Sequence, residues 1–155
     1  MHLPTSFEDF ARKKLATSPH ISCDWETLNN GDKRRLVIKR QKDNGFDITV
    51  ECETYGLYPF AGEWHGPAWD WFQEESLEEF FEEFMGFIRT LLSKDAMLEV
   101  RYSGNKPYKW CLTYETEQGQ EKLETGRIFY NYFGSKSTQV FQNDQLPQRY
   151  GQNAI

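Results

Sequence analysis

Two carboxylates, a histidine and two tryptophans lie within eight positions of the sequence, at residues 63–70. They are Glu63, Trp64, His65, Trp69 and Asp70. A pair of carboxylates can act as general acid and base on a glycosidic bond, with the tryptophan rings as stacking platforms for a sugar. The alternative is structural: the tryptophans close the end of a sheet and the carboxylates accept hydrogen bonds from backbone N–H groups. We favour the structural interpretation, because loops of this length need internal packing to stay ordered.

Other patterns of catalytic residues are absent from the sequence. The three histidines and three cysteines form no pair at metal-ligand spacing, and there is no glycine-rich phosphate loop and no GxSxG elbow. We therefore expect no metal and no cofactor, and a binding role rather than an enzymatic one. An odd number of cysteines without a CxxC pair indicates reduced, packed thiols. No signal peptide or membrane-spanning run is visible, so we expect a cytoplasmic protein without a membrane partner.

The carboxylates and tryptophans of residues 63–70 belong to a longer aromatic stretch, residues 55–72, which is expected to be a loop. It contains seven aromatic side chains, three glycines and two prolines. An amphipathic helix follows at Ser76, where Ser76 and Glu79 have the spacing of a capping box. Its apolar stripe is wide enough to cover a sheet, and consists of Leu77, Phe80, Phe81, Phe84, Ile88, Leu91 and Leu92.

The opposite face of this helix is acidic. Its carboxylates are Glu75, Glu78, Glu79, Glu82 and Glu83. Like-charge pairs four residues apart each cost about 0.2–0.5 kcal/mol, so such a face is unfavourable for the isolated helix. Either the face is simply solvated, or it docks a basic partner, with Trp64 or Trp69 as the buried anchor of the interface.

The charge of the whole chain is concentrated in its middle. Residues 46–100 hold two Lys/Arg and thirteen Asp/Glu, a net charge of −11, whereas residues 1–45 carry +3 and residues 101–155 carry +2. This distribution disfavours nucleic acid as a partner and favours a basic protein.

Hydrophobic alternation predicts one α+β domain over residues 1–155. We expect an antiparallel sheet of about six strands in αβββ-αβββ order, with both helices on one face. Ser6 is expected to cap the first helix. Asn30 and Gly31 suit the two central positions of a type I′ hairpin turn, which places Trp25 opposite Leu36.

The third strand is expected to follow a three-residue loop, residues 43–45, with Gly45 in a left-handed conformation. This loop would place Leu36 opposite Cys52, and Arg35 opposite Glu53. Carboxylates on the third strand would therefore neutralise much of the basic run in residues 33–42. The polar residues 143–155 are expected to form a flexible tail.

The whole chain resembles the small immunity proteins of bacterial polymorphic toxin systems. The resemblance lies in its size, its expected cytoplasmic character, its α+β order and a concentrated acidic surface with tryptophans that are expected to be exposed. It implies a non-enzymatic inhibitor that binds a cognate toxin, often a basic nuclease, and blocks its active site. One alternative is a carbohydrate-binding or carbohydrate-active protein that uses residues 55–72, and another is a stand-alone fold with a small ligand that the sequence does not identify. The resemblance involves no single motif, so it assigns no residue a role.

Overall fold

The computed structural model describes residues 2–127 and 133–150, and they form an α+β fold of two α-helices and antiparallel sheets, as the sequence predicts. The strands divide between two sheets rather than forming one. The first sheet has the order β1-β2-β3-β4-β5 with β6 also paired to β4, and the second has the order β10-β7-β8-β9. The elements are α1 (Leu3–Leu15), β1 (Cys23–Leu28), the 3-10 turn η1 (Asn29–Gly31), β2 (Lys33–Ile38), β3 (Ile48–Cys52), β4 (Gly56–Ala61), β5 (Trp64–His65), β6 (Trp69–Asp70), α2 (Leu77–Leu92), β7 (Ala96–Ser103), β8 (Lys106–Thr116), β9 (Gly119–Gly126) and β10 (Lys136–Phe141).

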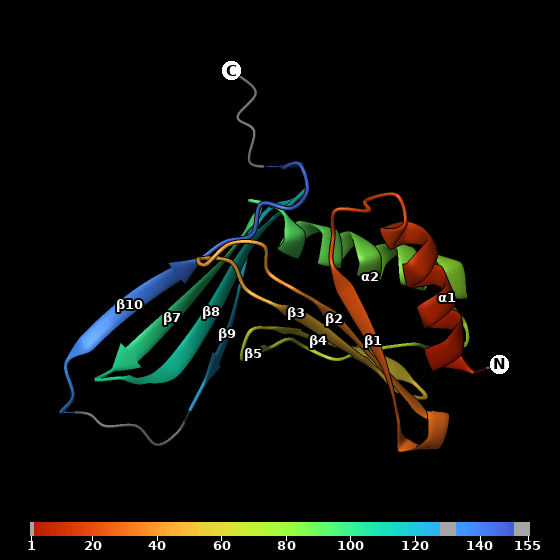
Figure 1. The fold of residues 1–155 in the computed structure, drawn as a ribbon, viewed down its shortest axis with the longest axis horizontal. Helices are drawn as coiled ribbons and strands as arrows, with labels where there is room; N and C mark the ends of the chain where they lie inside the picture. The colour runs from red at the N-terminus through yellow and green to blue at the C-terminus, as the bar shows by residue number, and fades with distance from the viewer. Residues whose placement is uncertain (1, 128–132, 151–155) are drawn as a thin grey trace.

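The two sheets splay apart, and both helices lie on one face of the first sheet (Figure 1). Helix α2 runs from that sheet toward the second one, so its apolar stripe lies between them. Phe84, Ile88 and Leu91 of α2 are fully buried, together with Val50 of β3 and Leu112 of β8. One continuous core therefore includes both sheets and both helices.

The β1–β2 hairpin has the predicted register, but its connection is longer than the predicted two residues, because β1 ends at Leu28, β2 begins at Lys33 and Asn29 also has a positive φ, of 50°. Asn30 and Gly31 have φ values of 55° and 104°, and the Asp32 N–H donates to the Asn29 carbonyl over 3.2 Å. A type I′ turn requires positive φ at both central positions. Trp25 pairs with Leu36, as predicted.

The register of β3 differs from the prediction by two residues. Leu36 pairs with Val50 rather than Cys52, and Arg35 pairs with Glu51 rather than Glu53. A shift of two residues keeps the same side chains on the core face, so the predicted core is unaffected. The loop is longer than three residues because β2 ends at Ile38 and β3 begins only at Ile48.

Gly45 is needed in that longer loop for a different reason from the predicted one. Its φ is not positive; instead, a Cβ atom there would lie 2.7 Å from Oδ1 of Asn143. Asn143 is 1% exposed and belongs to the segment predicted to be flexible. That prediction is wrong for residues 143–150, which pack on the fold, whereas residues 151–155 lie outside the described residues.

Carboxylates on neighbouring elements neutralise much of the basic run, as predicted. Glu51 accepts from Lys33 over 2.6 Å and from Arg35 over 2.9 Å. Burial raises the pKa of Glu51, but the hydrogen bonds from these two residues outweigh it and hold the pKa below its ordinary value. Most of the basic side chains of β2 are therefore held in ion pairs within the fold.

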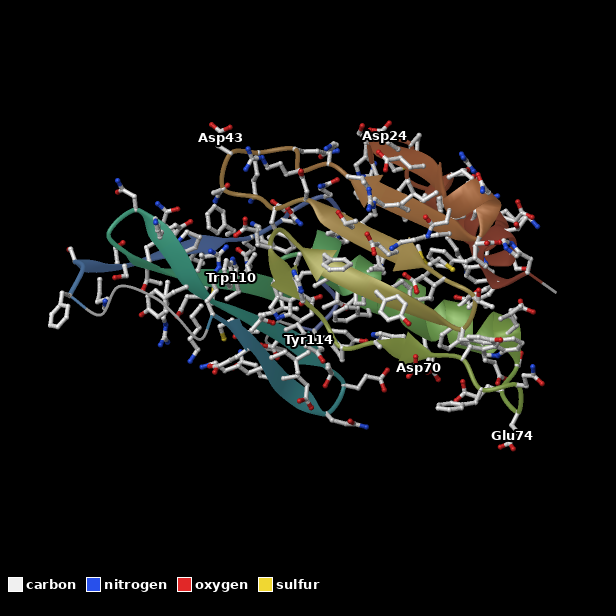
Figure 2. All side chains as sticks on the ribbon, turned by 90° about the horizontal axis from the view of Figure 1, so that it is seen from below. Asp24, Asp43, Asp70, Glu74, Trp110 and Tyr114 are labelled. Carbon is white, nitrogen blue, oxygen red and sulfur yellow. The ribbon has the colours of Figure 1, made fainter. Side chains whose placement is uncertain are left out.

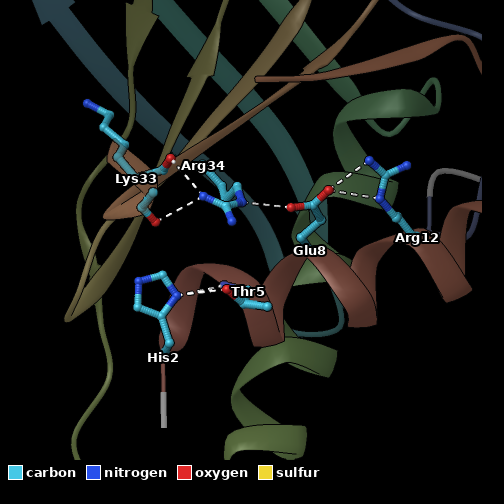
Figure 3. A network of polar contacts seen from close by, with 7 residues as sticks. His2, Thr5, Glu8, Arg12, Lys33 and Arg34 are labelled. Atoms are coloured by element: carbon cyan, nitrogen blue, oxygen red, sulfur yellow. Dashed lines mark hydrogen bonds and ion pairs between the residues drawn. The ribbon is translucent and has the colours of Figure 1, made fainter. Parts of the chain in front are cut away.

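Helix α1 contributes to the same network (Figure 3). Glu8 accepts from Arg34 of β2 over 2.8 Å and from Arg12 on the next helical turn over 2.7 Å. The helix begins earlier than predicted, at Leu3, because the ring of His2 rather than Ser6 supplies the N-cap, accepting from the Thr5 N–H over 3.4 Å.

Candidate functional site: an acidic–aromatic surface

The acidic face of α2 is exposed along its first two turns. The helix begins after Ser76, whose hydroxyl accepts from the Glu79 N–H over 3.4 Å, so the predicted N-cap is present. The five predicted carboxylates are all exposed: Glu78, Glu79, Glu82 and Glu83 on α2, and Glu75, which precedes the helix. Four of the five line a shallow hollow of about 440 Å³ together with Ser76.

Among the described residues, these carboxylates have a single cationic partner. Glu82 pairs with Lys14 of α1 over 2.5 Å and so connects the two helices. No ion pair within the described ranges involves Glu75, Glu78, Glu79 or Glu83. By contrast, the carboxylates Glu8 and Glu51 are paired with arginine or lysine. The α2 face therefore keeps its negative charge available to a partner.

Two exposed aromatic side chains lie beside the start of this helix. The Trp71 N–H donates to the Tyr55 carbonyl over 2.8 Å, which brings the two ends of the aromatic stretch together. Tyr55 is 72% exposed and Phe72 is 64% exposed. The Glu75 N–H donates to the Phe72 carbonyl over 2.9 Å, so a tight turn places Phe72 next to the first glutamate of the acidic face.

We call this region the acidic–aromatic surface, and define it as Tyr55, Phe72, Glu74, Glu75, Glu78, Glu79 and Glu83. Figure 2 shows Glu74 projecting outward at the lower right of the molecule, with Asp70 on the same lower side of the view. Tyr55 and Phe72 were not among the candidate residues from the sequence. Their exposure depends on the strand pairing of the segment, and the sequence shows only that both are aromatic.

Neither tryptophan predicted as an anchor is an exposed side chain, although Trp69 lines a hollow together with Glu83. Trp64 is fully buried in the core, and a Cβ atom on Gly66 would lie 2.7 Å from its ring. Trp69 is half-buried against Phe84 and Phe87, with ring centroids 5.2 and 5.7 Å away. The expectation that residues 55–72 form a loop is wrong, because the segment pairs as β4, β5 and β6. The structural interpretation of Trp64 agrees with its burial.

The strand pairing separates the two carboxylates of residues 63–70. Trp64 pairs with Ala61 at one end of β4, whereas Asp70 pairs with Gly56 at the other end. Five residues of strand span about 17 Å, and Glu63 lies beyond that end. Paired carboxylates in glycosidases are about 5–9.5 Å apart, so Glu63 and Asp70 do not form such a pair. The third candidate, His65, is exposed and packs its ring against Phe60.

Two further observations concern metal ligands and membrane-spanning helices. Within residues 2–127 and 133–150, no group of three or more His, Cys, Asp or Glu side chains is arranged to hold a metal ion. In the same residues, no helix combines the length and apolar character needed to cross a bilayer.

Comparisons with known proteins add no family to this description. No protein-family model, no curated protein and no solved structure matches the chain.

Proposed function

We propose that this protein is a non-enzymatic binding module that docks a basic protein on its acidic–aromatic surface. The observation that carries the proposal is the contrast in ion pairing. Carboxylates on β3 and α1 pair with basic side chains of the fold, whereas Glu75, Glu78, Glu79 and Glu83 have no such partner among the described residues.

The repulsion within the acidic face supports a role beyond solvation. Glu78–Glu82 and Glu79–Glu83 are like-charge pairs at i,i+4 within α2, and each costs about 0.2–0.5 kcal/mol. The helix dipole offsets part of this cost for Glu78 and Glu79 in the first turn but not for Glu83. A basic partner would replace these repulsions with attractive contacts across the interface.

The two exposed aromatic rings suit the anchoring part of the same interface. Binding energy at protein interfaces is concentrated in a few large side chains surrounded by polar ones, and charged residues there act mainly on the rate of association. Phe72 and Tyr55 would bury their rings against the partner, while the glutamates would steer it.

The finer proposal is that the partner is a toxin and that binding neutralises it. This follows from the resemblance to immunity proteins and from the charge of −11 in residues 46–100. An inhibitor of this class covers the active site of its toxin and needs no catalytic group of its own.

The anchoring role can be tested with a basic toxin candidate encoded beside this chain, immobilised for surface plasmon resonance. Replacing Phe72 with Ala should raise the dissociation rate by about thirtyfold, which corresponds to about 2 kcal/mol. The matched control is Val140→Ala, since Val140 is an exposed apolar side chain on β10 of the other sheet. Equal dissociation rates for the two variants would rule out Phe72 as an anchor.

The glycan alternative has one supporting observation, the exposure of Tyr55 and Phe72 near Asp70. A glycan array probed with the wild-type protein and with Phe72→Ala distinguishes the two functions. Binding of a defined glycan that Phe72→Ala abolishes would favour the carbohydrate alternative over a protein partner.

A further inference from the structure

A second candidate site lies at the opposite end of α2, in a cavity of about 420 Å³. This volume is within the range of about 300–1,000 Å³ that small-molecule sites occupy. The end of α1, the following loop, one side of α2 and the C-terminal segment form its walls. Its apolar lining consists of Leu15, Ile21, Met85, Ile88, Leu92 and Leu146.

Helical spacing places one stripe of α2 along this cavity. Glu82, Met85, Gly86, Arg89 and Leu92 recur at intervals of three or four residues, and all five line it. A Cβ atom on Gly86 would have no atom within 4 Å, so the helix backbone is open on this side.

Arg89 is the group that indicates a ligand. Its Nε atom is buried and has no hydrogen-bond partner, and no ion pair within the described residues involves its guanidinium. The buried Nε atom is out of reach of a ligand in the cavity, but the terminal N–H groups of an Arg fork are suited to bidentate contact with a carboxylate.

The charges around the cavity favour an anion. Besides Arg89, it is lined by Arg149, whose side chain forms no ion pair in the described part of the chain, and by Lys14, which is paired with Glu82. The carbonyl ends of α1 and α2 each add a partial negative charge of about half a unit, and together these are smaller than the two positive charges of Arg89 and Arg149. The cavity is thus cationic although the whole protein carries −6.

We propose that this cavity binds a small amphipathic carboxylate. The carboxylate accepts hydrogen bonds from the guanidinium of Arg89, with Arg149 at the mouth. The apolar part of the ligand packs on Met85, Ile88 and Leu146. This proposal is independent of the protein-binding function, because Tyr55, Phe72 and the unpaired glutamates do not line the cavity.

The test is a titration with octanoate followed by NMR of ¹³C-methyl-labelled methionines. Met85 lines the cavity, whereas Met97 is exposed on β7 and serves as an internal reference. Octanoate should shift the Met85 resonance in a saturable way and leave the Met97 resonance unchanged. Octanol, which has the same chain without the charge, should bind at least about tenfold more weakly.

The decisive variant is Arg89→Met, which removes the charge and the unpaired donor but keeps a similar length. Octanoate should bind it at least about tenfold more weakly than wild type. Arg101→Met on β7 is the matched control, and should bind octanoate like wild type. Absence of a saturable Met85 shift, equal affinity for octanol, or equal affinity of Arg89→Met would each overturn the proposal.

Discussion

The side-chain amide of Asn143 pairs with the backbone of Phe46 as a neighbouring strand would. Oδ1 of Asn143 accepts from the Phe46 N–H over 3.0 Å, and Nδ2 donates to the Phe46 carbonyl over 3.1 Å. Nδ2 also donates to the carbonyl of Leu91 near the end of α2, over 3.0 Å. One buried amide thus joins the β2–β3 loop, α2 and the C-terminal segment.

Replacing Asn143 with Ala should therefore lower the free energy of unfolding by about 2–4 kcal/mol. The substitution removes three hydrogen bonds and leaves buried backbone groups of Phe46 and Leu91 without partners. Urea denaturation measures the change, with Gln139→Ala as the control, because Gln139 is exposed on β10. A loss below about 0.5 kcal/mol would show that water replaces the amide at little cost.

Two glycine-to-alanine substitutions should have opposite effects on stability. At Gly45 the added Cβ would lie 2.7 Å from Oδ1 of Asn143, so we expect a loss of about 1–3 kcal/mol. At Gly86 the Cβ would meet nothing within 4 Å in a helix interior, so we expect a gain of about 1 kcal/mol. Thermal and urea unfolding of the pair would contradict this account if both variants changed stability in the same direction.

Ionisation of the Cys52 thiol should lower the free energy of unfolding in alkaline solution. Burial, with a smaller contribution from Glu53, raises the pKa of its thiol from 9.0 to about 12. The unfolded chain loses this proton first, so the group has no effect below about pH 9. Between about pH 9 and 12 it lowers the free energy of unfolding by up to about 1.4 kcal/mol per pH unit.

Urea denaturation from pH 8 to pH 10.5 measures this dependence on pH. Cys52→Ala is the control: it should be less stable than wild type at pH 8 but lose less stability as the pH rises. Parallel pH profiles for the two proteins would show that Cys52 does not cause the loss.

Trp64 should act as a core residue and not as a binding residue. Trp64→Ala removes a fully buried ring, so we expect a loss of about 3–5 kcal/mol in the free energy of unfolding. Phe72→Ala removes a ring that is 64% exposed, and should change stability by less than about 0.5 kcal/mol. Chemical denaturation of both variants would contradict the assignment if their stabilities were similar.

Much of this fold follows from local sequence signals. Asn30-Gly31 determines a hairpin register through its backbone preferences, and the apolar stripe after Ser76 defines α2. The predicted register of β3 against β2 was wrong by two residues, because a shift of two residues leaves the alternation of apolar and polar side chains unchanged. The packing of Asn143 was missed because its partners are 52 and 97 residues away in the sequence.

The candidate site was only partly predictable for a related reason. The acidic face of α2 follows from helical periodicity, and its exposure is as expected. Whether an aromatic residue in residues 55–72 is buried depends on which strand pairs with which, and that pairing buries Trp64 and exposes Phe72. The contact of Glu82 with Lys14 depends on how the two helices pack.

The ion pair between Glu82 and Lys14 determines which charges to reverse in a test of the proposed protein-binding function. Lys at position 82 would face Lys14 and disturb the packing of α1 on α2. Glu79 and Glu83 form no ion pair among the described residues, so their reversal leaves the fold intact and alters the surface alone. The matched control is Glu117→Lys with Glu121→Lys, the same change in charge at exposed positions near the β8–β9 turn.

The most direct measurement is the association rate of a basic toxin candidate at about 20 mM and 500 mM salt. For wild type the rate should fall by about tenfold or more as salt increases, because screening removes electrostatic steering. Glu79→Lys with Glu83→Lys should associate about tenfold more slowly at low salt, and the control pair should associate like wild type. A toxin that binds the Glu79/Glu83 variant as fast as wild type at low salt would contradict the proposed function.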